Sequence, residues 1–293
     1  GMPFAQVNGQ NIYYEDTGGR GPDIVFSHGL LMDHTMFEPQ IQALQGQYRC
    51  ISWDERGHGQ TADPEHCEAF SYYDSADDLA ALLKYLGVEK AVLVGMSQGG
   101  YLSLRCALIH PDVVGALVLI DTQAMLEDPE QMPHHEALLK AWMEHGLSDD
   151  MATIVEHTIL GQGWPGAAQW RAKWKQASPI NLGQSFATLA LRDGESYLAW
   201  GSPGGDQQDQ WQLLYLLRTL VGGYTPQQAI DAPRCFAGPE GFEVERGYDP
   251  AIRAALAEMG HSVTVPDTPL GGAQAILIGA DGLLDRKSTR LNS

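Results

Sequence analysis

Cationic side chains are scarce in this sequence. Its 18 lysine and arginine residues stand against 37 aspartate and glutamate residues, which gives a formal net charge of −19 at pH 7. Nucleic acids bind proteins largely through cationic groups that neutralise phosphates, and anionic membrane surfaces attract the same groups. The charge balance therefore argues against a nucleic-acid partner and against an anionic membrane.

Cysteines and long apolar runs are also scarce. The four cysteines, Cys50, Cys67, Cys106 and Cys235, show neither metal-ligand nor redox spacing. Cys50 and Cys106 fall inside a predicted strand and a predicted helix, so we expect buried free thiols there. No apolar run approaches the roughly 20 residues that span a bilayer, and we see no signal peptide. We expect a cytoplasmic protein without membrane association and without a bound metal.

Short apolar segments alternate with helical segments in the first 120 residues. Alternating polarity at Asn11–Glu15 predicts an edge strand. Four short apolar runs are typical of buried parallel strands: Asp23–Ser27, Arg49–Trp53, Ala91–Val94 and Ala116–Ile120. Helices are predicted at Thr35–Leu44, Ser75–Leu86 and Gln98–His110. The alternation predicts an α/β fold, with helices on both faces of a parallel sheet.

Ser97 lies between a predicted strand and a predicted helix. It is the central residue of Gly95-Met96-Ser97-Gln98-Gly99. In the G-x-S-x-G pattern, a sharp turn between strand and helix lifts the serine hydroxyl above the sheet edge, and flanking glycines relieve the crowding. The context predicts that Ser97 is a catalytic nucleophile.

A serine that attacks a carbonyl needs hydrogen-bond donors for the oxyanion that forms. One natural donor is the backbone N–H of the residue after the nucleophile, here Gln98. The strand Asp23–Ser27 runs into His28-Gly29-Leu30, and the loop after an early strand supplies the second donor. We predict that the N–H of Leu30 fills this role.

Four motifs give residues 4 to about 190 a resemblance to the α/β-hydrolase superfamily, in its branch of small esterases, enol-lactonases and cofactor-free haloperoxidases. They are Ser27–Gly29, Trp53–Thr61, Val94–Gly100 and Leu117–Thr122. The resemblance implies a small ester or lactone substrate and neither cofactor nor metal. It also implies a core over residues 1–127 and a helical cap over residues 128–187, where the sequence turns helical and rich in tryptophan.

The base and the acid expected of this family are missing from their usual place. The resemblance implies the chain order serine, acid, histidine, with the last two in strands that follow the cap. After Arg192-Asp193 no such strands follow, and His261 is the only histidine beyond that point. A predicted helix, Pro250–Met259, precedes it where the family has a strand. Asp121, at the end of a predicted strand, is an alternative acid position in some members of the fold.

Residues 188–284 resemble a different family, the γ-glutamyltransferases, over the last third of their small subunit. The matching segments are Asp193–Trp211, Gln227–Arg234, Val244–Gly247, Met259–Val263 and Gly271–Ile276. The resemblance implies a partial Ntn-hydrolase-like α+β segment in which Gly204 and Gly205 contribute to an oxyanion loop. The nucleophile of that family is an N-terminal threonine freed by self-cleavage, and it lies upstream of the part retained here.

Residues 285–293 resemble the translation of a sequencing adapter, and we expect an artefactual or disordered tail. Three interpretations follow for the whole chain. It is a serine hydrolase of the α/β type, with His261 as its only downstream base. Alternatively, it is a non-catalytic chimeric reading frame, or a natural fusion that includes a γ-glutamyltransferase-like fragment. The oligomeric state does not follow from the sequence.

Overall fold

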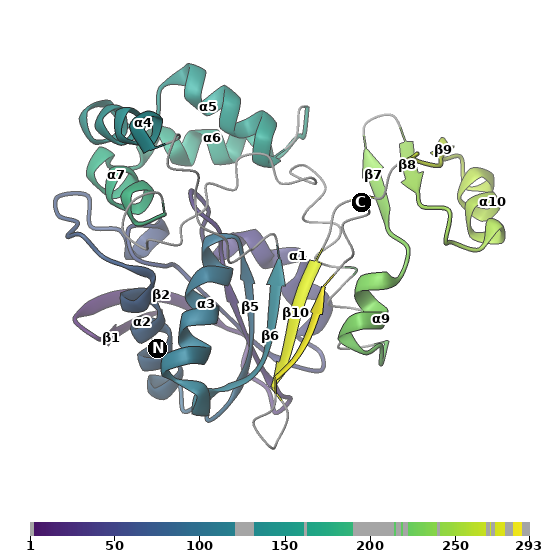
Figure 1. Cartoon of the computed structure of the whole chain (residues 1–293), viewed down its shortest axis with the longest axis horizontal. Coiled ribbons are helices and arrows are strands. Elements are labelled where there is room, and N and C mark those ends of the chain that lie inside the picture. The colour runs from purple at the N-terminus through teal and green to yellow at the C-terminus, as the bar shows by residue number, and fades with distance from the viewer. Residues whose placement is uncertain are drawn as a thin grey trace.

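A computed structural model of the chain describes residues 3–120, 132–160, 163–189, 222–238, 241–267, 273–278 and 284–288, together with residues 214, 218 and 270. Its main feature is an eight-stranded sheet with the order β1-β2-β4-β3-β5-β6-β10-β11 (Figure 1). The strands are β1 (Phe4–Val7), β2 (Gln10–Asp16), β3 (Asp23–Ser27), β4 (Arg49–Trp53), β5 (Ala91–Met96), β6 (Val114–Ile120), β10 (Ala273–Ile278) and β11 (Leu284–Ser288).

The four central strands are parallel, and the strands at both ends are antiparallel. β4 pairs with β3, β3 with β5 and β5 with β6 in parallel. β2 joins β4 antiparallel, and β1 joins β2 antiparallel. The predicted strands are confirmed, with β3 and β4 at the predicted bounds.

Helices connect the strands in the predicted order. They are α1 (Glu38–Leu44), preceded by the short helix η1 (His34–Phe37), α2 (Tyr72–Tyr85) and α3 (Gln98–Ile109). α2 begins three residues before the predicted Ser75 because Ser71 and Asp74 form a capping box, each side chain accepting the other residue's backbone N–H. The short helices η2 (Gly59–Thr61) and η3 (Pro111–Val113) follow β4 and α3.

Alternate residues of each central strand face opposite cores. In β3, Ile24 and Phe26 belong to one apolar cluster, and Val25 belongs to the other. The first cluster includes Phe37 and three tryptophans of the cap segment, and the second includes Leu79 of α2. Burial of both faces explains why these strands read as continuous apolar runs.

The predicted helical cap is present. It comprises α4 (Met132–His145), α5 (Asp149–Val155), the π-helix η5 (Glu156–Leu160), α6 (Ala167–Gln176) and α7 (Pro179–Ala187), which lie together beyond one end of the sheet in Figure 1. Trp142, Trp170 and Trp174 are buried. No helix among the described residues combines the length and apolarity needed to cross a membrane.

The remaining elements are a second, smaller sheet and two helices. The sheet has the order β7-β8-β9, with β7 (Cys235–Gly238), β8 (Gly241–Val244) and β9 (Val263–Thr264). α9 (Pro226–Asp231) precedes this sheet and packs against β10 and β11 of the large sheet, and α10 (Pro250–Glu258) lies between β8 and β9. Figure 1 shows this sheet to one side of the large one.

Residues 284–288 form a strand, which differs from the disordered structure expected from residue 285 onward. β10, from the γ-glutamyltransferase-like segment, pairs antiparallel with β6, with Ala275 opposite Val118. β11, which includes Asp285 to Ser288, pairs with β10. The physical reason is that β6 would otherwise leave its outer row of N–H and C=O groups unpaired, and an added strand satisfies them whatever its origin.

Candidate active site

Ser97 occupies a strained turn between β5 and α3. Its backbone has φ 50° and ψ −113°, a combination that L-residues rarely adopt and that costs of order 1–3 kcal/mol. Its N–H donates to the Ile120 carbonyl at 2.9 Å, which ties the turn to the end of β6. Such strain persists only where the surrounding structure imposes it, and it concentrates at functional sites.

Two glycines permit this turn. A Cβ atom on Gly95 would lie 2.2 Å from the Gly99 carbonyl oxygen. A Cβ atom on Gly99 would lie 2.0 Å from the Ser27 carbonyl oxygen and 2.7 Å from that of His28. These are backbone atoms, so the turn and the loop after β3 meet at distances that exclude a side chain.

The loop after β3 holds its backbone in a tight turn at Leu30. The Gly29 carbonyl accepts hydrogen bonds from His28 Nδ1 at 2.8 Å and from the Met32 N–H at 3.1 Å. Leu31, the next residue, has φ 67°. A trans peptide group points its N–H away from its C=O, so the two bonds to the Gly29 carbonyl fix the direction of the Leu30 N–H.

A buried carboxyl group lies behind both loops. Glu55, which is 1% exposed, accepts a hydrogen bond from Gln98 Nε2 at 2.9 Å, and Gln98 Oε1 accepts one from the Tyr72 hydroxyl at 3.2 Å. The Glu55 N–H donates to His28 Nε2 at 3.0 Å, which places the ring proton of neutral His28 on Nδ1. Burial raises the pKa of the Glu55 carboxyl from 4.5 to about 7.

His58 is buried beside this network and is not suited to act as a base. Its Nδ1 lies 2.7 Å from the Arg56 carbonyl oxygen. Burial, with the neighbouring His28, lowers the pKa of the His58 imidazole to about 3. The ring therefore stays neutral near pH 7 with Nδ1 engaged, which agrees with a structural role in the loop after β4.

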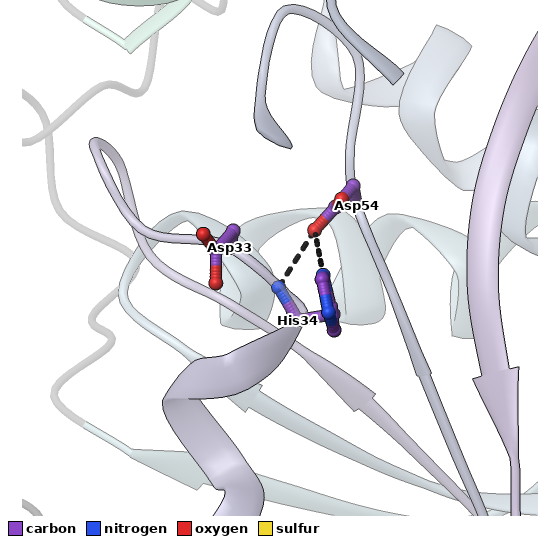
Figure 2. Close-up of side chains that lie close together, drawn as sticks. All are labelled: Asp33, His34 and Asp54. Carbon is purple, nitrogen blue, oxygen red and sulfur yellow. Dashed lines mark hydrogen bonds and ion pairs between the residues drawn. The ribbon is translucent and has the colours of Figure 1, made fainter. Parts of the chain in front are cut away.

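Asp33, His34 and Asp54 form a second polar cluster at the ends of β3 and β4, shown in Figure 2. Asp54 Oδ1 accepts from the His34 N–H at 2.7 Å and lies 2.9 Å from His34 Nδ1, and Asp54 Oδ2 accepts from the Gln60 N–H at 2.8 Å. Burial would lower the pKa of His34, but the bond to Asp54 and the nearby carboxylates raise it. The three residue types suit a metal ion, but these bonds already explain Asp54 as a brace between the two loops.

Helix α6 of the cap contacts the loop that follows β3. Lys173 Nζ lies 2.6 Å from Asp33 Oδ2, above the ring of Trp170 at 4.3 Å. Trp174 Nε1 donates to the Leu31 carbonyl at 2.8 Å. These contacts link residues about 140 positions apart, and no local pattern in the sequence indicates them. They connect α6 directly to the predicted oxyanion loop.

We expect Lys173→Met to lower the free energy of unfolding by about 0.5 to 1 kcal/mol, a modest loss because the ammonium group of a partly exposed ion pair remains well solvated. Lys175→Met is a matched control, since Lys175 pairs with the exposed Asp149. Urea denaturation of both variants measures the difference. Equal stabilities would contradict a fastening role for Lys173.

Of the other predicted site residues, only His261 belongs to the part of the chain that the structure describes. His261 is exposed in the part of the chain around the small sheet, and its ring packs edge-on against Phe242 with centroids 4.8 Å apart. Ser97 lies at the end of β5 in the large sheet, and Figure 1 shows the two sheets apart. Asp121, Gly204 and Gly205 lie outside the described residues.

Comparisons with known proteins agree with both resemblances. Residues 22–160 match the family described as alpha/beta hydrolase fold, and residues 182–290 match Gamma-glutamyltranspeptidase. Residues 22–160 thus match the α/β-hydrolase fold, and the resemblance and fold class predicted for this segment are confirmed. The second match begins close to residue 188, where the predicted change of family falls.

The relatives of the first segment are hydrolases. The chain is 37% identical over 109 residues to a 2-(acetamidomethylene)succinate hydrolase of Mesorhizobium japonicum, covering 37% of this chain and 38% of that protein. It is 41% identical over 83 residues to 3-oxoadipate enol-lactonase 1 of Acinetobacter baylyi, covering 28% of this chain and 30% of that protein. The chain thus spans less than half the length of these curated relatives.

Solved structures show the same fold. An enol-lactonase from Burkholderia xenovorans aligns with a TM-score of 0.57 at 23% identity, covering 66% of this chain and 75% of that one. An esterase from Exiguobacterium antarcticum aligns with a TM-score of 0.56 at 26% identity, covering 65% of this chain and 75% of that one.

Proposed function

We propose that this chain is an α/β-type serine hydrolase for a small ester or lactone, with Ser97 in the nucleophile position, and that it is inactive as written because the segment carrying the histidine and the acid is replaced. The observation that carries the proposal is the strained backbone of Ser97, held between β5 and α3 by Gly95 and Gly99. A non-glycine residue at this φ and ψ needs a reason, and presentation of a nucleophile above a sheet edge supplies one. The named esterase and lactonase relatives support the substrate class.

In the proposed reaction, Ser97 Oγ attacks the carbonyl carbon, and the C=O electron pair moves onto oxygen. The N–H groups of Leu30 and Gln98 hold the oxyanion. The alcohol or the opened lactone oxygen then leaves, and water hydrolyses the acyl-serine. A base must remove the Ser97 proton and return it to the leaving oxygen, with an acid behind the base to orient it.

We further propose that the chain lacks this base and acid. The segment that would supply them follows the cap, and residues 182–290 there match a different family. His261 is exposed at the small sheet, and Asp121 stays only an alternative acid position. In serine hydrolases, loss of triad members lowers turnover on the order of 10⁴ to 10⁶ and leaves only what the oxyanion hole and binding contribute.

The test is hydrolysis of p-nitrophenyl acetate by the whole chain. We expect the wild type to be no faster than Ser97→Ala, because the serine is an unactivated alcohol. Turnover that disappears in both Ser97→Ala and His261→Ala would show that His261 completes a triad. Turnover that needs Ser97 but not His261 would point to another base.

A second candidate function rests on the Gamma-glutamyltranspeptidase match over residues 182–290. We propose that this segment is a non-catalytic fragment, since its family's threonine nucleophile lies upstream of the part retained. Release of p-nitroaniline from γ-glutamyl-p-nitroanilide by the purified chain would contradict this. The cytoplasmic location expected from the sequence stays a prediction.

A further inference from the structure

Glu55 contacts the loops of both proposed oxyanion donors. Its Oε1 accepts from the side chain of Gln98, whose own N–H is one donor. Its backbone N–H holds the ring of His28, and that ring holds the Gly29 carbonyl of the Gly29–Leu30 peptide. Its second oxygen, Oε2, has no hydrogen-bond partner among the described residues and lies 3.4 Å from His28 Nδ1.

We propose that Glu55 is a positioning residue that ties both oxyanion donors to one buried carboxyl group, and that its ionisation reorients the Leu30 N–H. This inference rests on the proposed function, because it takes Leu30 and Gln98 as the donors. Glu55 itself does not touch the substrate. It acts through His28 and through the side chain of Gln98.

The reorientation follows because the Gly29 carbonyl and the Glu55 carboxyl group compete for the hydrogen bond from His28 Nδ1. His28 Nδ1–H lies 2.8 Å from the Gly29 oxygen and 3.4 Å from Glu55 Oε2. A hydrogen bond to a carboxylate is roughly twice as strong as one to a neutral acceptor. Ionised Glu55 therefore draws the Nδ1–H toward Oε2, and the Gly29 carbonyl keeps only its bond from the Met32 N–H.

Several titratable groups surround Glu55. The pKa of its carboxyl rises from 4.5 to about 7 through burial, while His28 and the Gln98 bond lower it and Asp54 raises it. His58 stacks near His28, with ring centroids 4.9 Å apart, and stays neutral because its pKa is lowered to about 3. The Tyr72 hydroxyl bonds Gln98.

Arg56 and Asp78 form an ion pair at 2.6 Å, and Asp78 also accepts a hydrogen bond from Asn8 Nδ2 at 2.8 Å. The protonation of Glu55 also makes the stability of the fold depend on pH. Its raised pKa means that the folded chain holds this proton more tightly, so the contribution to stability is full below pH 4.5 and is lost as the pH rises to about 7.

The test follows the backbone amide signals of Leu30 and Gln98 by NMR, in protein carrying isotope-labelled leucine and glutamine, across this pH range. We expect both amides to shift with one midpoint near pH 7. Glu55→Gln keeps the shape and the acceptor oxygen but cannot ionise, so both shifts should vanish. Glu15→Gln is the matched control, because Glu15 contacts His34 in the same region but not this network, and the shifts should persist.

Absence of a common midpoint in the wild type overturns the proposal. So does the same midpoint in Glu55→Gln, which would assign the titration to His28. If Glu55→Gln does not fold, the Gln98→Met variant tests the proposal instead. Loss of the donor to Oε1 should move the Leu30 midpoint upward, and an unchanged midpoint would contradict the proposal.

None of these measurements needs turnover, and Ser97→Ala should titrate like the wild type. Ester turnover that depends on Ser97 would contradict the proposed loss of base and acid, and it is visible only in the ester assay. Failure of the positioning proposal shows only in the amide titration.

Discussion

Gly99→Ala is expected to lower the free energy of unfolding by about 3 kcal/mol or more, the upper range for overpacking a close contact. The added Cβ would lie 2.0 Å from the Ser27 carbonyl oxygen and 2.7 Å from that of His28. Both oxygens belong to backbone at the end of β3, which is paired on both sides by β4 and β5. Relief would require α3 and the Ser97 turn to move away from the oxyanion loop.

Gly46→Ala is the control. A Cβ atom there has no neighbour within 4 Å, and no positive φ is involved. A surface substitution of this kind changes stability by roughly 0.5 kcal/mol or less. Urea denaturation compares the two variants. If Gly99→Ala were as stable as Gly46→Ala, the turn would not be packed as tightly against β3 as the structure has it.

The nucleophile turn could be predicted because its determinants are local. The turn consists of the five residues from Gly95 to Gly99, with a strand directly before them and a helix directly after. The glycines that the turn requires are visible in the sequence itself. The central strands could be predicted equally well, because burial on both faces makes each of them a short apolar run in the sequence. The structure adds the strained backbone conformation of Ser97, which the sequence indicates only indirectly, through the G-x-S-x-G pattern.

The brace and fastening contacts could not be predicted because they join distant residues. Asp54 meets His34 only because β3 and β4 end side by side, and Lys173 meets Asp33 only because the cap folds over that edge. Glu55 belongs to a recognisable segment, but nothing local indicates that a glutamate in a loop is fully buried. A loop carboxylate is ordinarily solvated, so its burial is visible only in the fold.

The segment that forms β10 pairs with the large sheet although its sequence resembles a different family. Residues 271–276 resemble another family, yet Ala273–Ile278 forms β10 on the open side of β6. The central strands of the large sheet are parallel, but β10 runs antiparallel. Backbone hydrogen bonding needs no particular side chains, so a segment of foreign origin can cover an edge that the first half leaves open.

The decisive test of this covering is Gln274→Pro. β10 lies between β6 and β11, with Gln274 opposite Leu119 on one side and Ser288 on the other. In an interior strand, each N–H serves one neighbour or the other, and proline removes it while its ring disturbs the ladder. A buried partner left unsatisfied costs about 1–3 kcal/mol, and we expect a loss of about that size in urea denaturation.

Gln274→Thr is the matched control, because threonine suits a strand and keeps the N–H. We also expect Gln274→Pro to self-associate in sedimentation experiments, since a loosened β10 exposes the edge of β6 to other chains. If the proline variant were as stable and as monodisperse as the threonine variant, β10 would not be integral to the sheet. The hydrolase half would then leave its β6 edge open.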